Sequence, residues 1–393
     1  MATDQRSPEQ VAKDLWANGF TVRQAIVFWR TYGTPPRGDS YNITPMRILK
    51  PASGAWKGVI DKRSTTNEVV RDIVIKETAA KRCAYMHVMP GGPQQPKKLV
   101  SHWWGASFYE DLCCILEDAS GLNGWWLHIV TSYLELDELE GSCPTVPELR
   151  MPPNALDRSY WMCIFAVNQH VSICGSCNEC GIYDNTGRTC RGCQRPLHNP
   201  CPCGSAKYHS GHALCEMDKF HLVMEKMPEG LAVALDPRLV TATRVWVVSE
   251  IGKTLELKKE VRFYMAGSVD EEVIEEGVAI TSVRDCQASM PADKDRILRQ
   301  IEGGIGIVAY DEIVASTLRP VLLNLSLSTC VVERGRKSET SRHMRRLLEL
   351  RADPCHSSGS GESLVYFAAR DGHAEPLRLL IEAKADVDKA RTD

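Results

Sequence analysis

The sequence predicts a multidomain α/β chain in which a parallel sheet is covered by helices on both faces. Three observations support this prediction. Short apolar runs alternate with amphipathic segments, eight of the 16 cysteines fall between Cys174 and Cys215, and a helical pattern repeats near the carboxyl terminus. Alternating strands and helices are typical of parallel sheets. At 393 residues the chain exceeds what one hydrophobic core usually serves, so we expect two or three domains.

Residues 1–63 are expected to form a helical amino-terminal region followed by an irregular linker. Ser7 is a suitable N-cap ahead of Pro8, and a second amphipathic stretch runs from Thr21 to Gly33. The segment after the linker has one apolar helical face, made of Val69, Val70, Ile73 and Val74.

Residues 64–330 carry the α/β pattern. Strands are predicted at residues 99–101, 160–167, 230–236 and 261–267. Helices are predicted between and after them, at residues 108–119, 216–227, 241–257 and 289–301. This order predicts a Rossmann/flavodoxin-like parallel sheet, whose ligand crevice opens at the carboxyl ends of the strands.

Residues 338–393 contain an internal repeat. The string MRRLLELRADP from Met344 recurs as LRLLIEAKADV from Leu377, with aligned residues 33 apart. Thirty-three residues is the ankyrin period. The string GESL from Gly361 resembles the start of an ankyrin repeat, although no proline follows Ser363. We therefore expect one full and one partial ankyrin repeat, which would bind proteins and do no chemistry. A plain helical hairpin is the alternative.

Charge and composition exclude several classes of function. The 47 basic and 50 acidic residues give a net charge of −3, which argues against a dedicated binder of nucleic acid or anionic membranes. The amino terminus lacks the apolar core of a signal peptide, and no run of about 18 uninterrupted apolar residues predicts a membrane span. We therefore expect a cytoplasmic protein.

The cysteines predict a zinc site within an insertion at about residues 170–215. Clustered cysteines in a reducing compartment indicate a metal before disulfides. Cys177 with Cys180, and Cys190 with Cys193, form two C-x2-C pairs with nine residues between them. Four thiolates make a closed tetrahedral zinc site, which is structural. Free core thiols are the alternative.

A second set of metal-ligating residue types follows the first. Its members are Cys201, Cys203, His209, His212 and Cys215, with Cys174 and His198 nearby. Their spacing is irregular, so buried thiols and solvent-facing histidines are the alternative to a second zinc. The chain has no H-E-x-x-H or H-x-E…P-C-x-x-C pattern, which argues against a zinc hydrolase or deaminase.

Three short strings carry a resemblance to known families. They are VSHWWG from Val100, WMCIFAVNQ from Trp161, and VALD from Val233 followed by RVWVVSE from Arg244. Together they resemble heterokaryon-incompatibility (HET) domains and, more distantly, TIR domains. The combination with ankyrin repeats resembles uncharacterised proteins of unicellular algae. The chain departs from the HET pattern at Cys163 and Ala166, and from the TIR pattern at Arg244 and Val247.

Glu250 matches the glutamate with which TIR-type NAD hydrolases cleave the nicotinamide–ribose bond, so the resemblance implies an NAD site. A solvated or salt-bridged side chain is the ordinary alternative. Ser101 and His102 are not expected to act together, because adjacent residues on a strand point to opposite faces.

Besides a zinc-ribbon nucleic-acid reader, which the near-neutral charge disfavours, two functional hypotheses remain open. The first is an intracellular protein-interaction or signalling scaffold with ankyrin repeats and structural zinc. The second is an enzyme, an NAD glycohydrolase that uses Glu250.

Overall fold

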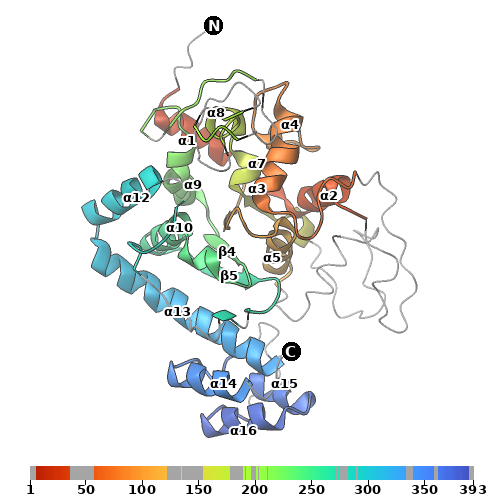
Figure 1. The fold of residues 1–393 in the computed structure, drawn as a ribbon, viewed down its shortest axis with the longest axis vertical. Coiled ribbons are helices and arrows are strands. Elements are labelled where there is room, and N and C mark those ends of the chain that lie inside the picture. The colour runs from red at the N-terminus through yellow and green to blue at the C-terminus, as the bar shows by residue number, and fades with distance from the viewer. Residues whose placement is uncertain are drawn as a thin grey trace.

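Figure 1 shows the fold of the chain in a computed structural model. The structure describes residues 6–35, 57–121, 134, 154–177, 189–190, 192–195, 201, 203–209, 211–270, 272–273, 282–288, 291–332, 340–357 and 362–388. In Figure 1, a sheet with helices around it lies above a long helix. The short helices of the carboxyl-terminal part lie below that long helix.

The sheet has five strands in the order β1 (Phe20–Thr21), β3 (Ser159–Trp161), β2 (Lys98–Ser101), β4 (Leu231–Leu235) and β5 (Val261–Met265). β1 is antiparallel to β3, and the other neighbours are parallel. The predicted α/β class with a mostly parallel sheet is therefore confirmed. The order reverses between β2 and β4, which is where parallel sheets of this kind open a crevice at the carboxyl ends of their strands.

Helices cover both faces of the sheet. α5 (Phe108–Ser120) follows β2, and α10 (Val245–Glu256) follows β4. Ala232 and Ala234 of β4 pack with Cys114 of α5, whereas the alternate residues of β4 join the main core with Val247 and Ile251 of α10. Because successive side chains of a strand point to opposite faces, α5 and α10 lie on different sides of the sheet.

Both amino-terminal helices begin where the sequence predicts, and the second also ends there. α1 (Pro8–Trp16) has Ser7 as its N-cap, and α2 (Val22–Tyr32) begins after Thr21 and ends at Gly33. The hydroxyl of each N-cap accepts a hydrogen bond from a backbone N–H of the first turn. α1 packs on α9 (Phe220–Lys226) and α2 packs on α5, so both helices lie against the sheet domain.

One continuous helical segment follows, built from α3 (Thr66–Val69), a π-helical turn η1 (Val70–Val74) and α4 (Ile75–Thr78). The four apolar residues that predicted its face are all buried. Further short helices in the described part of the chain are η2 (Tyr85–His87), η4 (Ala155–Asp157), α8 (Gln169–Ser172), η5 (Met217–Lys219) and η6 (Val240–Thr243).

The strand predicted at residues 160–167 is wrong in its second half. β3 ends at Trp161, and a helical turn, α7 (Cys163–Ala166), follows it. All residues of α7 are buried. A short apolar run that is buried all round has no periodicity that separates a strand from a helix, which explains the error.

A 26-residue helix, α13 (Ile307–Val332), joins the sheet domain to the carboxyl-terminal helices. Near its start, the Tyr310 hydroxyl donates to the carbonyl oxygens of Val248 and Ser249 in α10. A Cβ atom on Gly252 would lie 2.0 Å from that hydroxyl, so glycine permits this close approach. α12 (Pro291–Gly303) also packs on α10 and α13.

The far end of α13 packs against α14 (Thr340–Glu349) and α15 (Leu364–Arg370). α16 (Ala374–Glu382) packs on α14 and α15. At this end, the Val331 carbonyl oxygen contacts His373 Nδ1 at 2.8 Å.

Among the described residues, one helix is long and apolar enough to cross a membrane, at Ile307–Val331. The sequence-based expectation rested on uninterrupted apolar runs, and α13 escaped it because Asp311, Glu312 and Arg319 interrupt its apolar residues. Part of the helix is buried against α10, α12, α14 and α15, and a core helix passes the same test of length and composition.

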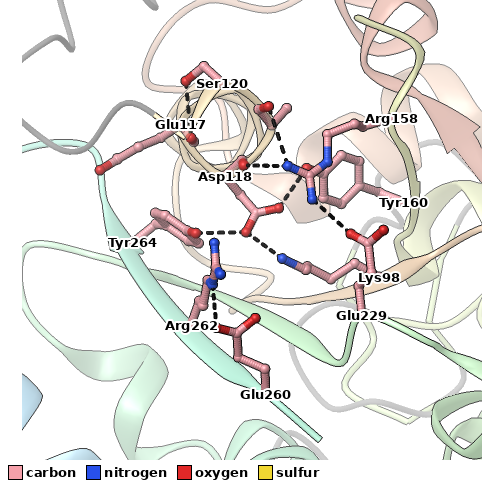
Figure 2. Close-up of polar contacts among 11 residues, drawn as sticks. Lys98, Glu117, Asp118, Ser120, Arg158, Tyr160, Glu229, Glu260, Arg262 and Tyr264 are labelled. Atoms are coloured by element: carbon pink, nitrogen blue, oxygen red, sulfur yellow. Dashed lines mark hydrogen bonds and ion pairs between the residues drawn. The ribbon is translucent and has the colours of Figure 1, made fainter. Parts of the chain in front are cut away.

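A buried polar network ties α5 to the sheet. Figure 2 shows Lys98, Tyr160 and Tyr264 converging on the carboxylate of Asp118. Lys98 Nζ lies 2.7 Å from Asp118 Oδ1, and the two tyrosine hydroxyls donate to the same carboxylate at 2.6 and 2.7 Å. Arg158 extends the network by donating to Asp118 O and to Glu229. All four central side chains are buried.

Candidate metal centre and interhelical cleft

Three of the four cysteines predicted as zinc ligands come together in the structure. One possible ligand atom from each of Cys177, Cys190 and Cys193 lies within 4.8 Å of the others, and this group is called the Cys177 cluster. The Sγ atoms of Cys177 and Cys193 are 3.5 Å apart, and the Gly192 N–H donates to Cys190 Sγ at 3.3 Å. The predicted fourth ligand, Cys180, lies outside the described residues.

A second group lies nearby in the chain and is called the His170 cluster: His170, Cys174, Cys201 and Cys203, with one ligand atom each within 4.8 Å of the others. Cys174 Sγ is 3.5 Å from Cys203 Sγ, and Cys201 Sγ is 3.5 Å from His170 Nδ1. In a tetrahedral site with Zn–S bonds of about 2.3 Å, neighbouring sulfur atoms are about 3.8 Å apart. Both clusters could therefore hold a metal ion.

The His170 cluster differs from the second set named from the sequence. Cys201 and Cys203 belong to it, whereas His209, His212 and Cys215 are in neither cluster of the described residues. His212 stacks on Tyr208 with ring centroids 4.6 Å apart, and its Nδ1 accepts the Leu214 N–H. Cys215 is buried. Through these contacts His212 is part of a packed turn, which gives it a structural role apart from metal binding.

Sequence reasoning missed His170 as a ligand residue. His170 lies on α8, four residues before Cys174, and this spacing places two side chains on one helical face. The four-residue spacing between His170 and Cys174 is a usable signal. It was overlooked because His170 precedes the regular C-x2-C pairs. Cys174 N–H donates to Gln169 O, which continues the turn of α8 to the cysteine.

Burial and nearby groups favour the ligand forms of His170 and Cys203, and oppose the ligand form of Cys174. Burial, with Lys207 and Arg82 nearby, lowers the pKa of His170 to about 4, so the imidazole is neutral at physiological pH. Burial acts to raise the pKa of the Cys203 thiol, but hydrogen bonds from Ser205, together with those from Cys174 and Cys201, outweigh it and the pKa falls to about 7. Burial raises the pKa of Cys174 to about 12, so metal binding there must release a proton.

A separate set of side chains meets at the carboxyl ends of β2 and β3. The Ser101 hydroxyl donates to the Glu250 carboxylate of α10. The next residue, His102, has Nε2 3.9 Å from Cys163 Sγ, which also accepts the Trp104 indole N–H at 3.3 Å. Ser101 and His102 thus turn to different partners, and they form no nucleophile–base pair.

Burial sets the protonation of these groups. It raises the pKa of Glu250 to about 7, although the Ser101 hydrogen bond opposes the shift. It also raises the pKa of Cys163 to about 12 and lowers that of His102 to about 4. Cys163 and His102 are therefore a neutral thiol and a neutral imidazole near pH 7, whereas Glu250 titrates in that range.

Glu250 also lines a cleft of about 240 Å³ between α9, α10, α12 and α13. Trp246 of α10 forms part of the wall, and the Arg296 guanidinium of α12 lies over its ring, 4.9 Å from the centroid. Tyr310 of α13 lines the same cleft. The residue whose carboxyl group titrates near neutral pH therefore lines a space that a small ligand can enter.

The candidate sites are thus two thiol-rich clusters and one carboxyl group beside a cleft. Comparison of the chain with family models, with curated proteins and with solved structures gives no match.

Proposed function

We propose that this chain is an intracellular protein-interaction scaffold, in which ankyrin repeats form the binding surface and zinc stabilises the Cys-rich insertion. The observation that carries the proposal is the regular packing of the last four helices. α13 packs on α14 as α15 packs on α16, while α13 also packs on α15 and α14 on α16. Two helix pairs that stack on each other are the building unit of a helical repeat array.

Two pairs of residues 33 positions apart have the same burial in both copies of the repeat. Leu347 and Leu380 are both buried, as are Ala352 and Ala385. Ser363 caps α15, and its hydroxyl accepts the Tyr366 N–H at 3.2 Å. These equivalences support an ankyrin assignment, and repeats of that type use their exposed side chains to bind proteins.

Zinc is the metal proposed for the Cys177 cluster, with Cys180 as the fourth ligand. Soft thiolates select zinc or iron–sulfur clusters over hard cations such as magnesium and calcium. A site of four thiolates is closed and leaves no position for substrate, so the role assigned to the ion is structural.

The zinc part of the proposal is tested by measuring metal in the purified chain. We expect bound zinc, and we expect Cys190→Ser to lose at least one ion per chain. Cys286→Ser removes a buried cysteine outside both clusters and should leave the zinc content unchanged. Protein that is folded and contains no zinc after expression with zinc present would contradict the proposal.

The interaction part is tested on the exposed apolar side chains of the repeats. Tyr366 and Ile381 are 43% and 50% exposed. Proteins that the wild-type chain captures and retains after cross-linking are the readout. We expect the double variant Tyr366→Ala/Ile381→Ala to capture fewer of them. Val308→Ala changes an exposed residue at the opposite end of α13 and serves as the matched control. An identical set of captured proteins for all three chains would argue against binding through the repeats.

The Glu250 cleft favours a second candidate function, NAD glycohydrolysis. In that reaction the bond between nicotinamide and ribose breaks, nicotinamide leaves with the bonding electron pair, and water adds to the ribose carbon. A carboxylate can stabilise the oxocarbenium-like centre that forms as the leaving group departs. Glu250 borders a cleft and is ionised in part near pH 7, which suits that role.

Incubation with NAD distinguishes the two functions. Under the enzymatic hypothesis, wild-type protein releases nicotinamide and Glu250→Gln does not. Glu225→Gln, on the exposed side of α9, should keep the activity. The absence of nicotinamide release by the folded full chain would leave the scaffold as the remaining proposal.

A further inference from the structure

We propose that His170, Cys174, Cys201 and Cys203 form a second zinc site, with three thiolates and one imidazole as ligands, and that this site attaches the Cys-rich insertion to the sheet domain. The inference shares with the proposed function the assignment of zinc to this insertion. It adds a ligand set, the atoms that bind and a distinct structural role.

The His170 cluster contains four described ligands. The contacts of 3.5 Å between Cys174 Sγ and Cys203 Sγ and between Cys201 Sγ and His170 Nδ1 form two opposite edges of a tetrahedron. These edges are close to the roughly 3.8 Å expected around zinc. Three thiolates and one imidazole are a ligand set typical of structural zinc.

A hydrogen-bond chain determines which nitrogen of His170 faces the sulfur atoms. The Thr78 hydroxyl donates its proton to the Val74 carbonyl oxygen at 2.6 Å. Thr78 Oγ1 must then accept from His170 Nε2, which lies 2.8 Å away. Nε2 therefore carries the ring proton, and the Nδ1 lone pair is left for the metal. Histidine ligands commonly have such a partner on the second ring nitrogen.

The same chain connects the site to the core. His170 is fully buried on α8, and Thr78 and Val74 are buried residues of the α3–η1–α4 segment. On the other side, the Tyr208 N–H donates to Val171 O, which brings the segment around Tyr208 against α8. A metal ion bound here would join residues 201 and 203 to a helix that is already part of the sheet domain.

A basic side chain balances the charge of this ligand set. Three thiolates and one Zn²⁺ have a net charge of −1. Lys207 Nζ lies 3.3 Å from Cys174 Sγ and also donates to the carbonyl oxygens of His170 and Ser205. The Ser205 N–H approaches Cys203 Sγ at 3.5 Å. Lys207 thus supplies a positive charge to Cys174, and Ser205 supplies a hydrogen-bond donor to Cys203. Without them, the negative charge of these sulfur atoms would be uncompensated.

The order of the ligands along the chain gives the two clusters different roles. Residues 170, 174, 201 and 203 enclose the whole Cys177 cluster, which spans residues 177–193. An ion in the His170 cluster therefore closes the base of the insertion. An ion in the Cys177 cluster closes a smaller loop farther from the sheet domain in sequence.

The experiment is a cobalt(II) titration of the metal-free full chain, read by the thiolate–cobalt absorption bands. We expect two ions per chain for wild type and one for His170→Ala. His209→Ala, which changes an exposed histidine outside both clusters, should still bind two. Thr78→Val should keep two ions but weaken one of them about 10–100-fold, because it removes the partner of the ligating imidazole.

Hydrogen exchange separates the structural roles. Loss of the His170 ion should expose the amides of residues 203–209, whereas Cys190→Ser should leave these amides protected. If His170→Ala does not fold, His170→Cys provides the second test, because it should retain two ions and shift the absorption of one toward the spectrum of a site with four thiolates.

Two bound ions in folded His170→Ala would overturn the inference. A single wild-type ion that is lost in Cys190→Ser but kept in His170→Ala would also overturn it while leaving the proposed Cys177 zinc intact. The reverse pattern would support the His170 site and refute the Cys177 site. The failure of one assignment is thus distinguishable from the failure of the other.

Discussion

Two buried carboxyl groups lie on opposite faces of the same sheet, and their pKa values are shifted in opposite directions. Asp118 is fully buried, yet Lys98 and the hydroxyls of Tyr160 and Tyr264 outweigh the effect of burial and lower its pKa. Glu250 is 8% exposed, and burial raises its pKa to about 7 despite the Ser101 hydrogen bond. The extent of burial is nearly the same, so the partners decide which carboxyl group stays ionised.

The difference separates a structural network from a candidate site. The Asp118 network contains its own cation and enough donors to satisfy the carboxylate. Among the described residues, no basic side chain forms an ion pair with Glu250. A carboxyl group that titrates near neutral pH beside a cleft can change its charge when a ligand or a cation arrives.

Removing the cation from the Asp118 network should have the largest effect on stability. Lys98→Met leaves a buried carboxylate without its countercharge, and we expect a loss of about 3–5 kcal/mol in the free energy of unfolding. Urea unfolding at pH 7 measures it. Adding Asp118→Asn to Lys98→Met removes the uncompensated charge and should recover most of the loss. A change below about 1 kcal/mol in the single variant would contradict this account.

Glu250 should make stability depend on pH in the opposite sense to Asp118. The folded-state pKa of Glu250 is raised, so its contribution is fully present below the unfolded-state pKa near 4.5 and is lost as pH rises through about 7. Relative to wild type, Glu250→Gln should therefore gain on the order of 3 kcal/mol between pH 4.5 and pH 8. Unfolding curves at several pH values test this, and a pH-independent difference would show that Glu250 is solvated.

The sign is reversed for Asp118 because its folded-state pKa is lowered. Its contribution is present above an unfolded-state pKa of about 4 and is lost as pH falls through the folded-state value. In the same unfolding series, the difference between wild type and Asp118→Asn should therefore shrink only below about pH 4.

Removing a tyrosine hydroxyl should lower the free energy of unfolding less than removing Lys98 does. The size of the loss should depend on the charge of the group that accepts the hydrogen bond. Tyr160→Phe and Tyr264→Phe each remove a hydrogen bond to the Asp118 carboxylate, and we expect a loss of about 1.5–3 kcal/mol for each. Tyr310→Phe removes bonds to neutral carbonyl oxygens and should lose about 0.5–1.5 kcal/mol. Equal losses in all three variants would mean that the charge of Asp118 adds nothing.

A surface ion pair should have the smallest effect. Lys76 and Asp72 are one helical turn apart, with 3.3 Å between charged atoms and a Lys76 side chain that is 52% exposed. Lys76→Met should change the free energy of unfolding by about 0.5 kcal/mol or less, since solvent screens such pairs. A loss comparable to that of Lys98→Met would mean that burial is not what distinguishes the two ion pairs.

Local sequence signals predicted the elements whose ends are encoded nearby. Ser7, Thr21 and Gly33 mark helix ends through caps that involve neighbouring residues, and the structure places the helices there. β1 was missed because two residues are too few for a periodic pattern. The sheet itself followed from alternating strands and helices, which is a pattern of the whole chain.

Contacts between distant segments explain what sequence reasoning missed at the sites. Lys98 looks like a surface charge at the start of a strand, and only the fold brings Asp118 to it. The Ser101–Glu250 contact joins residues 149 positions apart. Cys177, Cys190 and Cys193 were found from their spacing, whereas His170 depends on how residues 201 and 203 return to α8.

The continuity of α13 has a consequence for any protein bound by the last helices. A flexible tether would let such a protein explore a large volume, and its effective concentration at the sheet domain would depend on tether length. Here one helix, α13, contacts both α10 and the α14–α16 group. Packing therefore sets the orientation of the last helices relative to the sheet domain, and a protein bound to them would have little orientational freedom. A captured protein would therefore be presented to the sheet domain at a fixed distance and angle.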